Sequence, residues 1–491
     1  MNLILLRPEL ALLATAVAVI LVDLFVKRKG ILTVLSIIGL VIAGVYTLLM
    51  WDAGGQSVAG LIVVDNFALF FKMLFLGIAA FVILSSTDYV GKFSNFHGEY
   101  HALILLATLG MTLLSSATEL ITLYVSLEVL SLSVYALTGF LKDPKSSESS
   151  LKYMLLGAVS SAVLLYGMAL IFGFTGTTQL SGIAAAVDRV ASSSILDNPG
   201  LLMGIALLIA GFGFKVAAVP FQLWVPDVYE GAPTPIVGFL SVGSKAAGFA
   251  LILRVFYTAF ETPEWLSLDW GTVYAVIATL GMIVGNVSAI GQGNIKRLLG
   301  YSSIAQAGYL LVGVATLGMA PSTEIIGRSA ILFFLFSYAL ANLGAFAAII
   351  AISNKINSDE IKDYAGMGRR APLLSLCLTV CLISLIGMPP AAGFMAKFYL
   401  FNGAVQNGLL WLVIIAVLNS VVSAFYYLRV VKAMWVTPVD AANETASLEK
   451  IPASGALRVV LALTTLGVLY VGIAPDRVMN LAKWAAQIMG F

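Results

Sequence analysis

Charged residues, cysteines and histidines are all scarce in this sequence. Asp, Glu, Lys and Arg make up only 11% of the 491 residues, whereas soluble domains usually carry about 25%. The net charge of +2 gives no basic excess of the kind that binds nucleic acid. The only cysteines, Cys377 and Cys381, lie one helical turn apart, and we interpret them as small core residues because a metal site needs further ligands.

Motifs for redox cofactors are missing as well. The glycine-rich stretches GFGF and GQGN neither follow a strand nor begin a nucleotide-binding helix. No set of cysteines has the spacing that holds an iron–sulfur cluster. We therefore expect no cofactor and no metal in this chain.

Apolar residues are abundant, and they make up 60% of the chain. About 20 apolar residues in a helix cross a bilayer core that is about 30 Å thick. The alternating short strands of an outer-membrane barrel are absent. The sequence therefore predicts an all-α polytopic membrane protein with about 14 transmembrane helices, at 8–26, 31–51, 61–86, 101–116, 118–140, 152–174, 200–220, 234–257, 271–290, 299–319, 327–350, 372–401, 410–432 and 456–474.

The distribution of basic residues predicts the orientation. Lys and Arg collect in cytoplasmic loops, and Lys27, Arg28 and Lys29 follow the first span, whereas residues 51–60 after the second contain none. Basic residues recur in the other loops of the same side, namely Lys92, Lys142, Lys145, Lys296, Arg297, Lys355, Lys362, Arg369, Arg370, Lys432, Lys450 and Arg458. We expect no cleavable signal, and both termini on the periplasmic side of a bacterial inner membrane, with a thylakoid membrane as the less favoured location.

Four ionisable residues lie far from the ends of their spans. They are Glu128, Lys215, Lys245 and Lys397. Such a residue costs roughly 2.5–3.5 kcal/mol on insertion scales, and it usually faces protein or water and serves a function. A lysine that only snorkels or forms a structural ion pair is the alternative for any one of them. Four together favour a proton relay, because desolvation and a nearby carboxylate adjust the proton affinity of a lysine in opposite directions.

Two of these lysines lie close to a proline that interrupts their span. Pro220 follows Lys215, and Pro389 and Pro390 precede Lys397. Paired broken helices are typical of the transport site of inverted-repeat transporters. We predict one membrane domain, with N-terminal helices in 1–100, a first inverted repeat of five helices in 101–257, a second in 271–432, and a C-terminal loop and last helix in 433–491. Ser302, Ser303 and Gln306 form the polar face that corresponds to the Glu128 helix, and they either hold water or bond between helices.

Several long motifs resemble one family. GFGFKVAAVPFQLWVPDVYEGAPTP, SKAAGF, NIKRLLGYSSIAQAGYLLVG and GMPPAAGFMAKFYLF occur in the order found in the antiporter-like membrane subunits of proton-pumping NADH-quinone oxidoreductase, respiratory complex I. The resemblance covers about residues 60–435 and is greatest to the subunit N type, the counterpart of mitochondrial subunit 2, in which lysine stands at position 397.

The resemblance implies a role for each buried charge. Glu128 and Lys215 match the Glu and Lys of the first half-channel, Lys245 the connecting residue, and Lys397 the lysine of the second half-channel. Lys152 matches a further position, which we interpret as a modulator near Glu128, with a snorkelling lysine as an equal alternative. The family also implies that NADH, FMN, iron–sulfur clusters and quinone bind in partner subunits, and that further antiporter-like subunits adjoin this chain in the bilayer.

Two other functions fit the same residues. A subunit of a multisubunit cation/proton antiporter or of a membrane-bound hydrogenase would have the same helices and lysines, and the proteins that accompany the chain distinguish these from complex I. A scaffold whose lysines only hold partners together is the other alternative. Asp227 and Glu230, which follow the first break, are interpreted as capping or solvated loop residues in preference to a route by which protons enter.

Overall fold

The computed structural model describes residues 3–51, 54–87, 89, 96–190, 199–260, 264–319, 325–438 and 454–487, and these are almost entirely helical. Thirteen helical segments are long and apolar enough to cross a membrane. They comprise α1 (Arg7–Phe25), α2 (Gly30–Leu49), α3 (Asn66–Ser86), α4 (His97–Ser116), α5 (Leu120–Thr138), α6 (Pro144–Thr175), α8 (Pro199–Val216), the continuous α10 (Thr234–Phe239), η4 (Leu240–Ser244) and α11 (Lys245–Ala259), then α12 (Glu264–Ile290), α13 (Ile295–Met319), α14 (Ile325–Ile356), α18 (Leu410–Trp435) and α19 (Gly455–Ile473).

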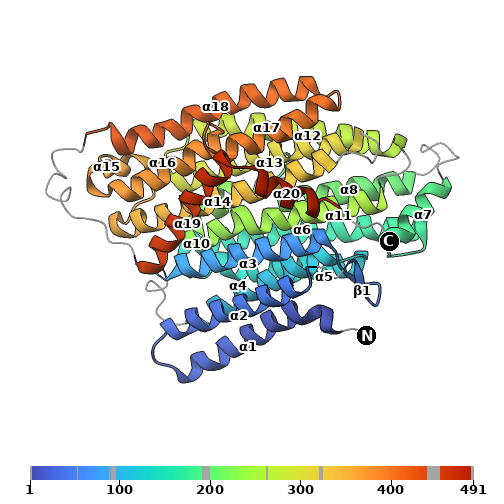
Figure 1. Cartoon of the computed structure of the whole chain (residues 1–491), viewed down its shortest axis with the longest axis horizontal. Helices are drawn as coiled ribbons and strands as arrows, with labels where there is room; N and C mark the ends of the chain where they lie inside the picture. Colours follow the sequence, from blue (N-terminus) through green and yellow to red (C-terminus); the bar gives the residue numbers. More distant parts are fainter. Residues whose placement is uncertain are drawn as a thin grey trace.

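A fourteenth span is divided in two. It consists of α16 (Pro372–Ile386) and α17 (Ala392–Gln406), which the Pro389–Pro390 segment separates. The predicted membrane fold is therefore confirmed, and so is the break in the expected 372–401 span. Figure 1 shows these helices side by side, with α1 and α2 at one end of the bundle and α18 at the other.

The remaining elements are short and lie at the ends of the spans. They are η1 (Leu3–Leu6), α7 (Leu180–Val190), α9 (Val225–Gly231), η5 (Ile361–Tyr364), α15 (Met367–Arg370), α20 (Asp476–Ala485) and the strands β1 (Gln56–Val58) and β2 (Ile62–Val64). Within α20, Trp484 stacks on Trp51, which follows α2, with ring centroids 4.3 Å apart. The Arg7 guanidinium at the start of α1 lies 5.9 Å from the Tyr46 ring near the end of α2. The first and last described helices therefore adjoin the same side of the bundle.

The predicted span 61–86 begins too early. Residues 62–64 instead pair antiparallel with residues 56–58, with Ser57 opposite Val63. The helix begins only after Asp65, whose side chain accepts a hydrogen bond from the Ala68 backbone N–H at 2.8 Å. A carboxylate at the N-cap satisfies one of the free N–H groups of the first turn, so the polar residue and not the apolar run sets the boundary. Two of the basic residues used for the orientation, Lys92 and Lys450, lie outside the described residues.

Two buried ion pairs join α3 to other helices, and neither pair was predicted from the sequence. Lys72 Nζ lies 2.8 Å from Glu9 Oε1 of α1, and these side chains are 0% and 5% exposed. Arg254 of α11 donates to both oxygens of Asp65, at 2.6 Å and 2.9 Å, and to the Ser115 carbonyl at 2.8 Å. Glu9 and Asp65 each stand next to the end of a span, where their charge is unremarkable in the sequence.

Asp65→Asn is expected to destabilise the protein strongly. The substitution leaves the Arg254 guanidinium buried without a counter-charge, and breaking a buried pair in this way costs about 3–5 kcal/mol. Thermal unfolding of the purified protein in detergent measures the effect. The matched control is Asp23→Asn, which breaks the more exposed pair with Lys29 and is expected to cost about 0–1 kcal/mol. Equal unfolding temperatures for the two variants would contradict this assignment.

Candidate functional site

Lys215 lies at the end of α8, immediately before the first break, and α5 supplies its partners. Its side chain is buried, and Nζ donates to Ser131 Oγ at 2.5 Å and to the Tyr135 hydroxyl at 3.5 Å. Ser131 and Tyr135 follow Glu128 by three and seven residues, so all three occupy one face of α5. The predicted Glu128 and Lys215 therefore share a helix face.

Glu128 and Lys215 nevertheless do not touch. The half-buried Glu128 carboxylate accepts a short hydrogen bond from Ser161 Oγ of α6. Among the described residues, no ion pair within 4.0 Å joins this carboxylate to Lys215. Each of the two groups instead has a serine hydroxyl as its partner, Ser131 for the lysine and Ser161 for the carboxylate.

The first break is held together by hydrogen bonds to released carbonyls. Pro220 lacks a donor, and α8 ends at Val216 instead of the expected residue 220. The Phe214 carbonyl accepts from the Trp224 indole N–H at 3.1 Å, and the Gly213 carbonyl accepts from the Ala218 N–H at 2.8 Å. The chain continues from this turn into the short helix α9 on the same side as the α5–α6 loop.

Lys245 lies where the central helix changes its winding. The π-helical η4 immediately precedes it, a feature that the small residues of SVGSKAAG did not reveal and that is frequent at functional sites. The buried Lys245 ammonium donates to both the carbonyl and the hydroxyl of Ser303 in α13. Tyr229 of α9 hydrogen-bonds to the same hydroxyl at 3.1 Å, and the Tyr338 ring centroid lies 5.7 Å from Lys245 Nζ.

Lys215 and Lys245 belong to adjoining helices. A Cβ atom added to Gly248 would lie 3.5 Å from Lys215 Cβ, so α8 and α11 approach closely at this level. Gly248 follows Lys245 by three residues, which is about one helical turn. The two lysines therefore flank one short stretch of α11.

Lys397 lies on the far side of the second break and uses a carbonyl that this break releases. Its buried Nζ donates to the Ile386 carbonyl at 2.8 Å and to Ser420 Oγ of α18. The Tyr309 ring centroid of α13 is 4.2 Å from Nζ. Gln306, one turn before Tyr309, donates to the neighbouring Leu385 carbonyl at 2.9 Å.

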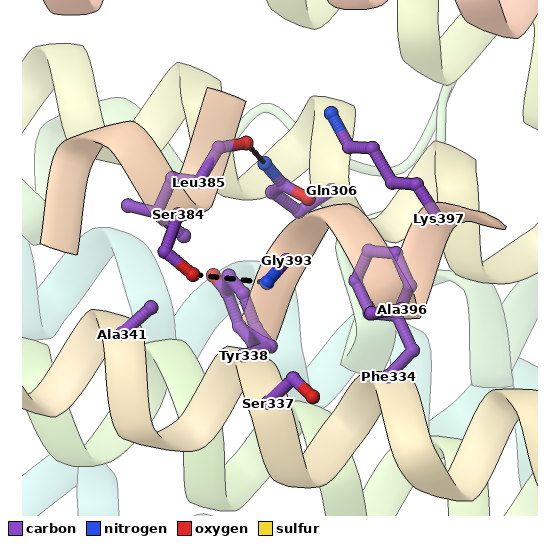
Figure 2. Close-up of a pocket in the computed structure, with 10 residues that line it drawn as sticks. All are labelled: Gln306, Phe334, Ser337, Tyr338, Ala341, Ser384, Leu385, Gly393, Ala396 and Lys397. Carbon is purple, nitrogen blue, oxygen red and sulfur yellow. Dashed lines mark hydrogen bonds between the residues drawn. The ribbon is translucent and has the colours of Figure 1, made fainter. Parts of the chain in front are cut away.

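A small cavity lies between Lys397 and Tyr338, the residue whose ring also lies near Lys245 (Figure 2). Its volume is about 10 Å³, close to the space that one water molecule needs. Tyr338 and Lys397 both line it, together with Gln306, Phe334, Ser337, Ala341, Ser384, Leu385, Gly393 and Ala396. The Ser337 hydroxyl, on a residue that lines the cavity, is buried without a hydrogen-bond partner, so a water molecule there would have a polar group to bind.

The predicted polar face of α13 bonds between helices. Ser302 hydrogen-bonds to the Tyr427 hydroxyl of α18, Ser303 accepts from Lys245, and Gln306 donates to α16. Of these three residues, Gln306 also lines the cavity beside Lys397. The polar face carries no charge of its own.

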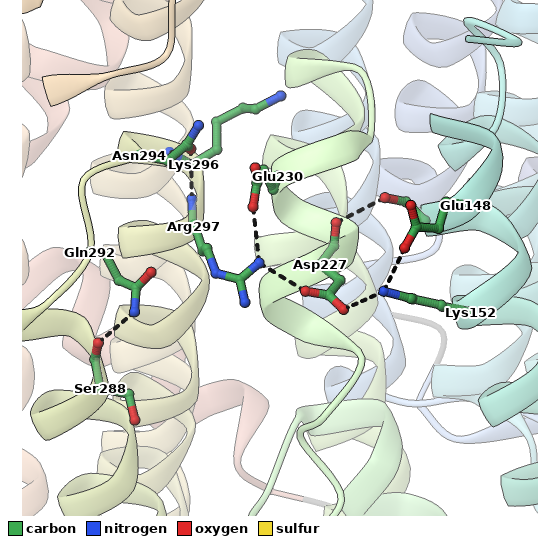
Figure 3. Close-up of polar contacts among 10 residues, drawn as sticks. Glu148, Lys152, Asp227, Glu230, Ser288, Gln292, Asn294, Lys296 and Arg297 are labelled. Carbon is green, nitrogen blue, oxygen red and sulfur yellow. Dashed lines mark hydrogen bonds and ion pairs between the residues drawn. The ribbon is translucent and has the colours of Figure 1, made fainter. Parts of the chain in front are cut away.

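Lys152 is brought to a different carboxylate from the one expected. Its side chain is 45% exposed, and Nζ lies 2.8 Å from both Asp227 Oδ2 and Glu148 Oε1. Within the described part of the chain, no hydrogen bond or ion pair joins Lys152 to Glu128. Arg297 of α13 binds Asp227 Oδ1 at 2.8 Å and Glu230 Oε2 at 2.9 Å, and Figure 3 shows the resulting network.

Asp227 and Glu230 are therefore ion-pair partners and not capping residues. Burial acts to raise the pKa of Asp227, but hydrogen bonds from Lys152 and Arg297 outweigh it and hold the pKa below its ordinary value of 3.8. A carboxylate with a lowered pKa stabilises the fold above that ordinary value, and the stabilisation is lost as the pH falls through the lowered pKa. The Asp227 carboxylate thus stays charged at neutral pH.

Among the described residues, no three or more His, Cys, Asp or Glu side chains cluster in a way that could hold a metal ion. Cys377 and Cys381 are free thiols buried in α16. Within the described ranges, the ionisable residues at the site are therefore positioned by hydroxyls, carbonyls and aromatic rings.

Comparison with known proteins gives a consistent result. A family described as NADH:quinone oxidoreductase/Mrp antiporter, TM, matches residues 117–423. NADH-quinone oxidoreductase subunit N of Dehalococcoides mccartyi is 48% identical over 98% of this chain and 99% of its own length. Its counterpart from Trichlorobacter lovleyi is 46% identical over 99% and 98%.

Chains of three solved membrane complexes are similar to this chain over nearly its full length. A chain of respiratory complex I from Thermus thermophilus with bound aureothin is similar with a TM-score of 0.80 at 33% identity, covering 97% of this chain and 99% of that chain. The archaeal membrane-bound sulfane sulfur reductase gives 0.87 at 27% identity, over 99% and 97%. The Mrp complex from Dietzia sp. gives 0.81 at 20% identity, over 99% and 97%, which is a likeness of fold.

Proposed function

The chain belongs to the subunit N family of NADH-quinone oxidoreductases, and from that premise we propose that it moves protons through Glu128, Lys215, Lys245 and Lys397. It is a multi-pass bacterial membrane subunit of a translocase and assembles with other membrane subunits, including antiporter-like ones. The redox cofactors reside in other subunits, and we assign NADH, FMN, iron–sulfur clusters and quinone to them.

The observation that carries the relay is the sequence of contacts between the buried lysines. Lys215 bonds to the hydroxyl face of α5 and lies beside α11. Lys245 of α11 donates to Ser303 of α13. Gln306 and Tyr309, which also belong to α13, adjoin Lys397. Each of the three ammonium groups donates to hydroxyl or carbonyl oxygens, so its proton is held by desolvated hydrogen bonds and not by a fixed counter-charge.

A proton passes between such groups through hydroxyls and water. In the first half, Lys215 bonds to Ser131 and Glu128 to Ser161, and a small shift of α5 against α8 changes the distance over which the Glu128 carboxylate stabilises the Lys215 ammonium. In the second half, the cavity lined by Ser337, Tyr338 and Lys397 has room for about one water. Lys152, which pairs with Asp227, remains a proposed modulator of the first half.

We also propose the division into inverted repeats at 101–257 and 271–432. The first helices of the two units pack against their successors in the same close manner. A Cβ added to Gly110 of α4 would lie 2.7 Å from the Leu130 N atom of α5, and one added to Gly285 of α12 would lie 2.5 Å from the Ala305 N atom of α13. The broken helices α8–α9 and α16–α17 occupy the fourth place in each unit.

For the orientation, we propose that both termini face the periplasm. With the divided α16–α17 counted as one span beside the thirteen long ones, the described part of the chain has an even number of spans. Helix α20 adjoins the segment between α2 and α3, which lacks Lys and Arg. The basic loops then lie on the cytoplasmic side.

Purification of the affinity-tagged chain from its native membrane in mild detergent tests the assignment of the complex. We expect it to co-purify with FMN-containing and iron–sulfur subunits, and we expect the preparation to reduce quinone with NADH. Recovery with cation/proton antiporter subunits, or with a hydrogen-evolving partner and no NADH oxidation, would contradict the assignment.

A further inference from the structure

The charged network on the basic-loop side joins three helices from both proposed repeats. We propose that Asp227 is a positioning residue that holds α9 between α6 of the first unit and α13 of the second, and thereby keeps the Lys215 and Lys245 sites aligned. This inference rests on the proposed relay, because alignment of the two lysines matters only if a proton passes between them.

Each carboxylate oxygen of Asp227 has its own partner on a different side. Oδ2 lies 2.8 Å from Lys152 Nζ of α6, and Oδ1 lies 2.8 Å from Arg297 Nη1 of α13 (Figure 3). The Asp227 backbone carbonyl also accepts from Ser149 Oγ of α6 at 2.9 Å. One residue of α9 is thus fixed to both neighbouring helices at once.

The short helix α9 reaches both lysine sites. Trp224, immediately before α9, donates to the carbonyl of Phe214, the residue that precedes Lys215. Tyr229, two residues after Asp227, hydrogen-bonds to the Ser303 hydroxyl that Lys245 also uses. A rotation or shift of α9 therefore moves one partner of each site, and Asp227 lies between these two contacts in the sequence.

Ion pairs hold α9 on its α13 side in addition to the Tyr229–Ser303 hydrogen bond. The helix has only seven residues and follows a break, so it has few backbone hydrogen bonds of its own. Arg297 of α13 pairs with Asp227 and Glu230, while Lys152 of α6 pairs with the other carboxylate oxygen of Asp227. The neutral Asp227→Asn variant turns one oxygen into an amide donor, which faces a cation that has only donors.

The test compares Asp227→Asn with Asp227→Glu in the assembled complex, and it uses two measurements. The first is the initial rate of proton translocation at equal NADH oxidation in proteoliposomes. The second is the distance distribution between nitroxides on ketone-bearing amino acids incorporated at Leu223, which is 72% exposed beside α9, and at the exposed Gly291 before α13. Ketone labelling leaves the cysteines of partner subunits unmodified, and the distance is measured whether or not the complex pumps.

For Asp227→Asn we expect a broadened distance distribution and about a fivefold fall in coupled translocation, the equilibrium effect of losing partly exposed ion pairs. Asp227→Glu keeps the negative charge, and we expect it to retain the wild-type distance distribution and the wild-type rate of translocation. The matched control, Glu148→Gln, removes only the 65% exposed partner of Lys152 and should change neither. If translocation is lost while the distance distribution is unchanged, Asp227 acts directly and the positioning role is overturned. If the distance distribution broadens while translocation stays complete, the position of α9 does not matter for translocation, and the proposal is overturned as well. A wild-type complex that does not translocate protons would refute the proposed proton relay, whereas the measured distances would still show whether Asp227 holds α9 against α13.

Discussion

Lys215→Ala is expected to leave an assembled complex whose coupled proton translocation falls by about a hundredfold or more, the order that loss of one positioned acid–base group produces. The ammonium is buried and bonds to Ser131 and Tyr135, and alanine supplies no group that takes up or releases a proton there. The measurement is the initial rate of acidification or alkalinisation inside proteoliposomes after NADH and quinone are added. Glu128→Gln should act in the same direction because it removes the charge that lies on the same face of α5.

The control for this experiment is Lys27→Ala, which removes an exposed lysine just after α1 and should leave translocation unchanged. Native gel electrophoresis and subunit content are measured in parallel. If the lysines only held partners together, Lys215→Ala would lower assembly and translocation equally. Normal assembly with impaired translocation supports the relay, whereas a parallel loss of both would favour the scaffold.

Lys397→Arg is the second substitution for which we expect a large effect. It keeps the positive charge, but a guanidinium does not deprotonate at any pH that the protein meets. The larger planar group must also fit beside a cavity of about 10 Å³ and against the Tyr309 ring. We expect coupled translocation to fall by about tenfold while the complex remains assembled.

The matched control is Lys29→Arg, the same exchange at a lysine that pairs with Asp23 and is 38% exposed. Arginine forms that ion pair as well as lysine does, so activity should be unchanged. Full translocation by Lys397→Arg would show that the residue supplies only a fixed charge. Recovery of activity in Lys397→His at a shifted pH would instead support a proton-carrying role, because imidazole titrates near neutral pH.

The membrane helices and the interruptions near Lys215 and Lys397 could be predicted from the sequence because they depend on local composition. A run of apolar residues of sufficient length is helical in a bilayer wherever it packs, and proline removes a backbone donor in any surroundings. The expected start at residue 61 was wrong, because the apolar residues Ile62–Val64 pair as a strand and Asp65 caps the helix. An apolar run alone does not distinguish these two conformations.

The partners of the charged residues could not be predicted, because they come from distant parts of the chain. Glu9 and Lys72 are 63 residues apart in sequence, and Asp65 and Arg254 are 189 apart, yet each pair lies within 2.8 Å. Asp227 looked like a loop residue, since nothing local shows that Lys152 and Arg297 converge on it. The hydroxyls of Ser131 and Ser303 likewise gain their roles only when helices from different spans meet.

The ionisable residues themselves were found because a charge within an apolar run is conspicuous. Their spacing along the chain predicted that they lie in separate helices, and the structure brings Lys215 and Lys245 together across α8 and α11. The sequence left open how close Glu128 lies to Lys215, and in the structure each of them bonds to a serine hydroxyl. Coupling between them then depends on distance and hydration, which a conformational change adjusts.

The number of protons translocated per NADH oxidised, measured in proteoliposomes for the wild-type complex and for Lys215→Ala at equal electron flux, tests the relay most directly. Equal flux removes any effect of the substitution on electron transfer in partner subunits. A relay through Lys215 predicts a lower proton-to-electron ratio in the variant, with an intact subunit composition. An unchanged ratio at an unchanged rate would contradict it.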